Sequence, residues 1–116
     1  MLGVGIDIVE IDRIKKQIDN KRFVEMVLSS EEIERFNNFS DIRKTEFLAG
    51  RFAAKEAIIK CLSDYENVNM NSLNITNNEK GKPEIKYKDY IILLSISHER
   101  HYAVAIASLE GRKWNF

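Results

Sequence analysis

The stretch from residue 42 to residue 62 constrains the fold more than any other part of the chain. It contains no proline, carries alanine at positions 49, 53, 54 and 57, and is apolar on nearly every side. An uninterrupted run of this kind favours a helix, and a helix that is apolar all round is covered by other elements. We therefore expect one long central helix.

The residues before this stretch predict a strand followed by short helices. Residues 2–9 alternate small or β-branched residues with glycine, a pattern typical of a short strand. From Glu10 the apolar spacing becomes helical. Asn20 is a candidate N-cap of a second short helix, and Ser29 or Ser30, followed by two glutamates, is a candidate N-cap of a third.

The residues after the central stretch predict two β-hairpins. Residues 73–76 and 84–87 flank a turn-rich segment that contains Gly81 and Pro83, and residues 91–97 and 102–109 flank a second short connection. Helices that precede strands in this way favour an α+β fold, in which the central helix packs on a small antiparallel sheet. The length of 116 residues suits one domain over 1–116 with a thin core, so association is expected to add stability.

Composition excludes several classes of function. Lys plus Arg equals Asp plus Glu at 18 each, so no net field attracts nucleic acid or an anionic membrane. No apolar run approaches the roughly 20 residues that a membrane span needs, and the first residues lack the basic segment of a signal peptide. Cys61 is the single cysteine, which suits a reducing cytoplasm.

Two acidic residues are expected in apolar surroundings. Asp7 falls inside the first strand, and Glu56 falls beside Phe52 on the most apolar side of the central helix. A buried carboxylate is costly unless it is paired or bound to a metal. For Asp7 the alternative is an edge position or a capping role. For Glu56 a pair with Lys60, four residues on, would contribute only ~0.3–0.5 kcal/mol when exposed.

A hard cation held jointly by Asp7 and Glu56 would compensate both acids. Magnesium suits such a pair, because it binds through one or two carboxylates and takes other ligands from substrate phosphates. The sequence offers no Cys/His cluster of the kind that zinc prefers. The two acids therefore predict a magnesium site.

The central helix also carries a basic stripe. Lys44, Arg51 and Lys55 fall within about 40° of one another on a helical wheel, where like charges repel. One interpretation is a solvated basic face. The other is an anion across the stripe, since Arg binds phosphate in bidentate fashion and Lys acts as a point charge.

Two further candidates lie in the C-terminal half. Gly81, Lys82 and Pro83 form an expected turn, and His98 ends an expected strand. Functional groups collect in loops of this kind. A structural role is the alternative for each of them.

Two segments resemble the holo-[acyl-carrier-protein] synthase family of phosphopantetheinyl transferases. Residues 3–14, GVGIDIVEIDRI, are similar to the N-terminal motif of that family. Residues 47–60, FLAGRFAAKEAIIK, contain its Phe-x-x-Lys-Glu-Ala-x-x-Lys signature. The Gly-Lys-Pro turn and the Ser-Ile-Ser-His segment follow in the family's order, so the resemblance spans nearly the whole chain.

The resemblance implies a transferase-like fold and a complete site. Asp7 and Glu56 would bind magnesium, and Lys60 would contact the reacting phosphates. Coenzyme A would be bound by basic and turn residues, namely Arg43, Arg51, Lys55, Gly81, Lys82, Pro83 and His98. The resemblance thus assigns the nucleotide contact to Arg43 rather than to Lys44 of the basic stripe.

The resemblance also implies partners. Apo acyl carrier protein, which is acidic, would dock through Arg13, Arg22 and Phe23, and the chain would form a homotrimer with sites between subunits. Two positions depart from the family's pattern: Lys80 stands where relatives often have Asn, and Glu99 stands where a small hydroxyl residue is common. These departures put nucleotide contacts in doubt and leave the expected metal ligands intact.

The implied reaction is attack by a serine hydroxyl of the carrier on the β-phosphate of coenzyme A, with release of adenosine 3′,5′-bisphosphate, in support of fatty acid biosynthesis. Glu56, through a metal-bound water, and Glu34 are the candidates for a general base. Two other functions remain open at this point. One is a catalytically silent module that binds carrier or nucleotide, and the other is a metal-dependent phosphohydrolase that consumes coenzyme A without an acceptor.

Overall fold

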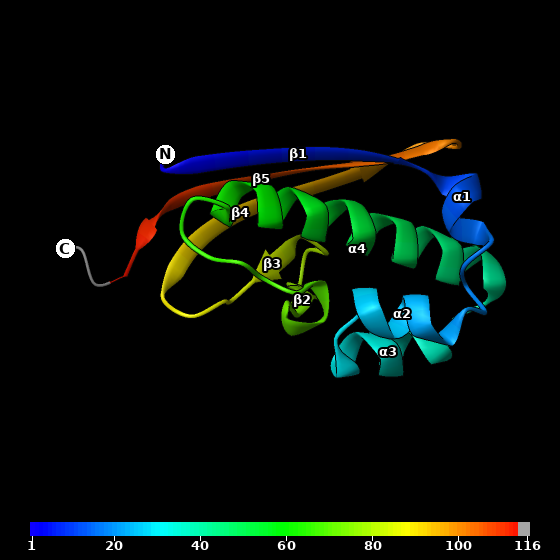
Figure 1. Ribbon diagram of the computed structural model, residues 1–116. Helices are drawn as coiled ribbons and strands as arrows, with labels where there is room; N and C mark the ends of the chain where they lie inside the picture. The colour runs from blue at the N-terminus through cyan, green and yellow to red at the C-terminus, as the bar shows by residue number, and fades with distance from the viewer. Residues whose placement is uncertain (114–116) are drawn as a thin grey trace.

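A 22-residue helix, α4 (Asp41–Leu62), runs through the middle of the molecule in a computed structural model that describes residues 1–113. Its N-cap is Ser40, whose hydroxyl accepts a hydrogen bond from the backbone N–H of Arg43. Figure 1 shows the larger sheet on one side of α4 and two of the short helices on the other. The expected central helix is confirmed.

The larger sheet is antiparallel and has the strand order β1-β5-β4. The strands span β1 (Gly3–Glu10), β4 (Tyr90–His98) and β5 (Tyr102–Arg112). The β4–β5 hairpin was expected, whereas the pairing of β1 with β5 joins the two ends of the sequence (Figure 1). The fold is α+β, as the order of helices and strands predicts.

Small residues let β1 approach α4 closely. A Cβ built on Gly3 would lie 2.3 Å from the carbonyl oxygen of Cys61. Gly5 meets the next turn of the helix in the same way. The side of β5 that faces the helix carries alanine at positions 103, 105 and 107, all buried. The backbone of α4 therefore lies directly against the N-terminal strand.

Three short helices pack on α4, and the second and third of them lie on the side opposite the larger sheet (Figure 1). They are α1 (Ile11–Lys15), α2 (Lys21–Val27) and α3 (Ser30–Asn37). Asn20 caps α2, as expected, and Ser29 rather than Ser30 caps α3. The first helix ends at Lys15, and Ile18 packs on the core from beyond its end.

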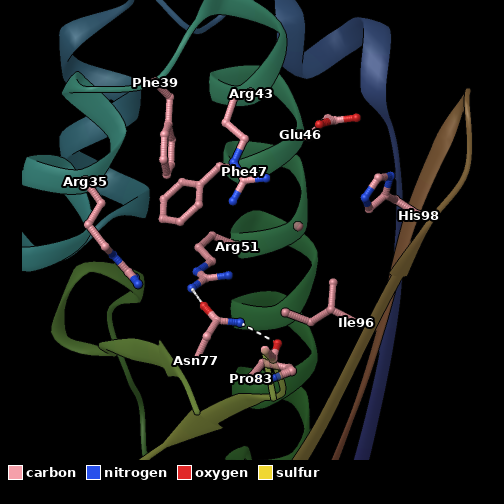
Figure 2. Close-up of a pocket in the computed structure, with 12 residues that line it drawn as sticks. Arg35, Phe39, Arg43, Glu46, Phe47, Arg51, Asn77, Pro83, Ile96 and His98 are labelled. Atoms are coloured by element: carbon pink, nitrogen blue, oxygen red, sulfur yellow. Dashed lines mark hydrogen bonds between the residues drawn. The ribbon is translucent and has the colours of Figure 1, made fainter. Parts of the chain in front are cut away.

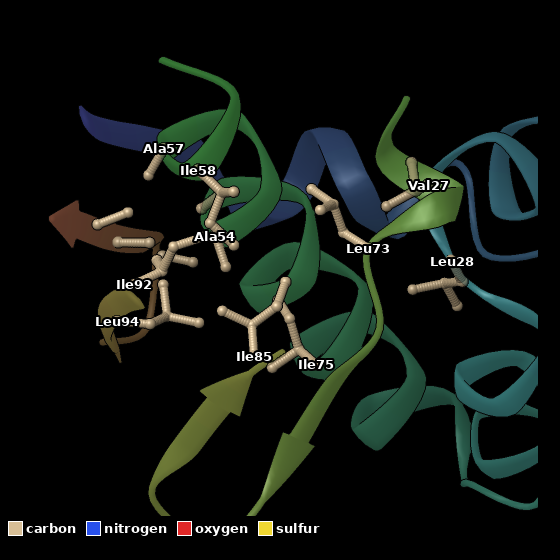
Figure 3. Close-up of a cluster of buried hydrophobic side chains, with 14 of the residues drawn as sticks. Val27, Leu28, Ala54, Ala57, Ile58, Leu73, Ile75, Ile85, Ile92 and Leu94 are labelled. Carbon is tan, nitrogen blue, oxygen red and sulfur yellow. The ribbon is translucent and has the colours of Figure 1, made fainter. Parts of the chain in front are cut away.

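A second, two-stranded sheet lies beside the C-terminal half of α4. It consists of β2 (Ile75–Asn77) and β3 (Pro83–Ile85), which follow a short 3-10 helix, η1 (Met70–Ser72). This is the first expected hairpin, with strands shorter than predicted. Figure 3 shows Ile75 and Ile85 of this hairpin beside Ala54 and Ile58 of α4, where the core lies.

The face of the larger sheet that points away from α4 is apolar and exposed. We call it the outer sheet face, and its residues are between 46% and 63% exposed: Val4, Ile6, Ile8, Leu93 and Ile106. Ile6 and Ile106 are directly paired across β1 and β5. Within residues 1–113, no helix combines the length and the hydropathy that crossing a bilayer requires.

Candidate functional site

A cavity of about 580 Å³ opens between the N-terminal half of α4, the β2–β3 hairpin and the end of β4. Figure 2 shows its lining residues, which come from α3, α4 and the strands. They include Arg43, Arg51, Gly81, Pro83 and His98, five of the residues expected to bind coenzyme A. A volume of this size suits a ligand as large as a nucleotide.

Guanidinium groups and phenyl rings alternate along one wall of the cavity. The ring of Phe47 has Arg51 at 4.4 Å and Arg35 at 5.3 Å from its centroid. Arg43 lies 5.0 Å from the centroid of Phe39, which meets Phe47 edge-on. Cation–π contacts of this kind hold the side chains in place while leaving their donors available. The wall therefore presents three cations in fixed positions.

Arg51 is the most buried of these cations. Its Nη2 donates to Asn77 Oδ1 at 2.8 Å and to the carbonyl of Ile75 at 3.3 Å. Burial lowers the pKa of Arg51 to about 10, with Arg35 and Arg43 acting in the same direction and Glu32 opposing it. At neutral pH the guanidinium remains charged, so the cavity carries a desolvated positive group.

The Gly-Lys-Pro segment closes the hairpin on the far side of the cavity. Asn77 Nδ2 donates to the carbonyl of Gly81, and Asn78 Oδ1 accepts from the backbone N–H of Lys82. Gly81 has a φ of 83°, which explains the glycine, because side chains disfavour this conformation. Lys82 lines a neighbouring cavity with Leu93 and Ile106 instead.

Lys55 and Arg51 face a buried carboxylate, which corrects both interpretations of the basic stripe. The Nζ of Lys55 donates to Glu32 Oε1 and to the carbonyl of Val27, and its side chain is 0% exposed. Arg51 Nε lies 3.6 Å from Glu32 Oε2. The third cation, Lys44, lies over the ring of Phe36. The stripe is therefore neither a solvated face nor a row of three anion ligands, and of its three cations it is Arg51 that lines the cavity.

Asp7, Glu56 and Lys60 lie outside this cavity. Lys60 Nζ donates to the carbonyl of Ile6 at 2.8 Å and lies 3.3 Å from Asp7 Oδ1. Glu56 lines a separate cavity with Phe52 and has no hydrogen bond or ion pair to any residue in the described part of the chain. Asp7 and Glu56 are half-buried, so the fully buried acid is Glu32 rather than either of these.

The two acids fit a magnesium ion as oxygen donors. Among residues 1–113, no three His, Cys, Asp or Glu side chains gather into a metal site. Magnesium does not require such a group, since it is commonly held by one or two carboxylates and completed by water and phosphate. The partial exposure of Asp7 and the unpaired carboxylate of Glu56 leave both able to accept a ligand.

The other predicted residues lie at the surface. Arg13 and Arg22 are exposed, and the ring of Phe23 stacks on Phe52 at 5.7 Å between centroids. Glu99, one of the two departures from the family's pattern, accepts hydrogen bonds from the backbone N–H groups of His101 and Tyr102. These bonds lower the pKa of Glu99, and the residue caps the β4–β5 turn.

Sequence reasoning missed part of the cavity wall and the acid behind it. The missed residues are Glu32, Arg35, Phe39, Glu46, Phe47, Gly50, Asn77 and Ile96. Most of them reach the cavity from other elements, so no spacing along α4 reveals them. Phe47 and Gly50 had a usable signal, because they stand four and one residues before Arg51 on the same helix.

Comparison with known proteins gives consistent matches over nearly the whole chain. Residues 3–107 match the model of the 4′-phosphopantetheinyl transferase superfamily. The holo-[acyl-carrier-protein] synthase of Staphylococcus aureus is 46% identical over 112 residues, which cover 93% of this chain and 94% of that protein.

Solved structures of the same kind of protein share the fold. A holo-(acyl-carrier-protein) synthase from Bacillus anthracis, in complex with CoA (3′,5′-ADP), has a TM-score of 0.83 at 38% identity, covering 93% of this chain and 95% of that one. The synthase from Neisseria meningitidis has a TM-score of 0.83 at 26% identity, with coverage of 96% and 99%.

Proposed function

The chain belongs to the 4′-phosphopantetheinyl transferase superfamily, and on this basis we propose that it is a holo-[acyl-carrier-protein] synthase. It transfers 4′-phosphopantetheine from coenzyme A to a serine of apo acyl carrier protein and releases adenosine 3′,5′-bisphosphate. The whole of residues 1–116 serves as one transferase domain that supports fatty acid biosynthesis.

The observation that carries this proposal is the wall of three guanidinium groups and two phenyl rings. Arg35, Arg43 and Arg51 outnumber Glu46, the one carboxylate that residues 1–113 contribute to the lining of the cavity. An excess of fixed cations favours the phosphates of a nucleotide, and the rings suit its base. The relative from Bacillus anthracis was solved with CoA (3′,5′-ADP), a ligand of this chemistry.

Asp7 and Glu56 would hold a magnesium ion. When bound, the ion would neutralise charge on the pyrophosphate of coenzyme A. Lys60, whose Nζ lies beside Asp7, would contact the same phosphates. Because Glu56 lacks a partner within residues 1–113, its carboxylate is also the better candidate to receive the serine proton.

The transfer itself is a displacement at phosphorus. The serine oxygen of the carrier forms a bond to the β-phosphorus of coenzyme A while the bond from that phosphorus to the bridging oxygen breaks. The proton of the hydroxyl passes to the carboxylate, and the electron pair leaves on adenosine 3′,5′-bisphosphate. Positive side chains around the phosphates stabilise the charge that develops on the leaving oxygen.

The arginine-lined cavity and Glu56 lie on different sides of α4. Arg51 and Glu56 are five positions apart, which places them about 140° apart around the helix axis. One coenzyme A molecule in the arginine-lined cavity would therefore leave the acids of the same chain out of reach. A homotrimer that brings the acids of one copy to the cavity of the next would complete the site, and the exposed outer sheet face supports such an assembly.

The carrier protein would dock beside the acids. Arg13 and Arg22 supply exposed positive charge to an acidic partner, and Phe23 packs on Phe52, which lines the same cavity as Glu56. Electrostatic docking of this kind speeds encounter between the partners. The buried thiol of Cys61 is compatible with the reducing cytoplasm, where we place the reaction.

Mass spectrometry of the carrier tests the proposal. Apo acyl carrier protein, incubated with the chain, coenzyme A and magnesium, is expected to gain the mass of one phosphopantetheine group. Absence of this gain with several carriers, including one from the same organism, would refute the transferase. A parallel incubation without carrier is expected to leave coenzyme A intact, whereas its breakdown would indicate a phosphohydrolase.

A further inference from the structure

Glu32 is a fully buried acid that has no role in the proposed transfer mechanism. Its carboxylate accepts hydrogen bonds from the backbone N–H of Ser29 at 2.8 Å and of Ile75 at 3.0 Å, and from Lys55 Nζ. Arg51 Nε lies 3.6 Å from its second oxygen. One carboxylate thus joins α3, α4 and the start of β2.

Helix capping accounts for part of this arrangement. Ser29 and Glu32 form a reciprocal capping box, in which each side chain accepts from the backbone of the other. A capping box can form on an exposed helix and needs no cation. The burial of Glu32 with Lys55 and Arg51 is therefore unexplained by capping.

The contacts divide the carboxylate between its two oxygens. Oε1 is taken by Ser29 and Lys55, and Oε2 by Ile75 and Arg51. Lys55 is fully buried, so it orients Glu32 rather than a ligand. The orientation of the carboxylate then determines where the Nε side of Arg51 rests.

The three nitrogens of the Arg51 guanidinium have different surroundings. Nη2 donates to Asn77 and Ile75, Nε lies 3.6 Å from Glu32 Oε2 as an ion pair without a hydrogen bond, and no described residue accepts from Nη1. Figure 2 shows the guanidinium in the middle of the lining residues of the cavity. Because the guanidinium is planar, the hydrogen bonds of Nη2 and the charge of Glu32 beside Nε together set the direction of Nη1.

We propose that Glu32 is a positioning residue for nucleotide binding, which holds Arg51 so that Nη1 faces a phosphate in the cavity. The inference rests on the proposed function, because it assigns Arg51 to a phosphate of coenzyme A. It adds a residue that touches no substrate and that acts through the two cations beside it.

Glu32→Gln tests this role, since it keeps the size of the side chain and removes its charge. Titration calorimetry with adenosine 3′,5′-bisphosphate is expected to show about tenfold weaker binding, equal to about 1.4 kcal/mol. The KM for coenzyme A should rise by a similar factor, with kcat changed less than about twofold. Glu31→Gln is the matched control, because this neighbouring acid is exposed. The Glu31→Gln variant should bind adenosine 3′,5′-bisphosphate as tightly as the unmodified chain does.

A double variant separates positioning from stability. Glu32→Gln alone leaves two buried cations without a counter-charge, which is destabilising. Glu32→Gln combined with Lys55→Met removes one charge of each sign, so the melting temperature should recover while nucleotide binding stays weak. Recovery of binding together with the melting temperature would reduce Glu32 to a structural role and overturn the inference.

A measurement on the unmodified chain covers the case in which neither variant folds. The Nε–H signal of Arg51 in a ¹H–¹⁵N spectrum, assigned with Arg51→Lys, is expected to exchange slowly with solvent. It should shift when adenosine 3′,5′-bisphosphate is added. A rapidly exchanging or unresponsive signal would overturn the role of Glu32.

The outcomes distinguish the two proposals. If the unmodified chain fails to bind adenosine 3′,5′-bisphosphate, the proposed function fails and the inference fails with it. If the unmodified chain and Glu32→Gln bind it equally well, the proposed function stands and the positioning role of Glu32 alone is refuted.

Discussion

A Cβ built on Gly5 would lie 1.9 Å from the carbonyl oxygen of Ala57, so β1 and α4 meet at this point backbone to backbone. Gly5→Ala is therefore expected to push the strand off the helix and to lower the free energy of unfolding by about 3 kcal/mol or more. Urea unfolding measures this change. Gly111→Ala is the control, because a Cβ there meets no atom within 4 Å. Equal stability of the two variants would contradict the close approach.

Glu56→Ala should abolish transfer and leave the fold intact. The carboxylate has no hydrogen bond or ion pair within residues 1–113, so its loss removes no stabilising contact. The mass gain of the carrier is expected to disappear, and the melting temperature to change by less than about 2 °C. In the unmodified chain, a chelator should stop transfer and added magnesium should restore it.

The exposed acid Asp64 supplies the control for that experiment, and Asp64→Ala should transfer at the normal rate. Full activity of Glu56→Ala, or transfer that persists in excess chelator, would remove magnesium from the mechanism.

Ile6→Lys is expected to dissociate the assembly. Ile6 is 59% exposed in the single chain and pairs with Ile106 on the outer sheet face, so a lysine there would bury a charge in an assembly that covers this face. Light scattering should report a mass near 13.5 kDa for the variant and a trimer for the unmodified chain. Ile42→Lys, which changes an exposed isoleucine on α4, should remain a trimer. A trimer in both variants would place the interface elsewhere.

Two inactive variants should restore activity when they are mixed. The proposed site has an acidic half, which contains Glu56, and a cavity half, which contains Arg51. Glu56→Ala inactivates the first half, and Arg51→Ala inactivates the second. If each site takes one half from each of two copies, random mixing in equal amounts leaves about one quarter of the sites with both halves intact. Transfer should therefore return after the two variants are unfolded and refolded together, and not when each is refolded alone. No recovery would indicate that both halves of a site come from one chain.

Cys61 should react slowly with thiol reagents. Burial raises the pKa of its thiol to about 11, so about one molecule in a thousand carries the thiolate at pH 8, against about one in four for a free cysteine. Labelling in the folded protein is expected to be more than about 100-fold slower than in denaturant. Rapid labelling of the folded chain would contradict the burial of Cys61.

The raised pKa also fixes the sign of a stability change with pH. The folded state holds the thiol proton more tightly than the unfolded state, so this contribution is complete below the ordinary pKa of a cysteine and is lost as the pH rises toward about 11. The midpoint of urea unfolding should therefore be lower at pH 10 than at pH 8.

The local features of the fold could be predicted from the sequence. The central helix, the caps at Asn20 and Ser29 and both hairpins depend on residues that are neighbours along the chain, so spacing is sufficient to find them. The pairing of β1 with β5 joins segments from opposite ends of the sequence. No periodicity within either segment identifies its partner.

The site was predictable in part for the same reason. A helical wheel shows that Arg51 and Lys55 share a side of α4, but it does not show what covers that side. The covering residue, Glu32, comes from another helix, takes Lys55 into a buried ionic cluster and leaves Arg51 as the member of this pair that also lines the cavity. Resemblance to a family found Arg43, Gly81, Pro83 and His98 in the cavity, whereas the phenyl rings between the arginines emerged from the three-dimensional structure.

The pairing of β1 with β5 has a consequence for the order of folding during synthesis. Gly3 pairs with Leu109, so the N-terminal strand leaves the ribosome about a hundred residues before its neighbour in the sheet exists. Throughout that interval Val4, Ile6 and Ile8 have no β5 beside them, and the edge of β1 is open to other chains. Such distant contacts also close slowly. A nascent chain of this protein is therefore expected to need chaperone protection until its last strand has emerged.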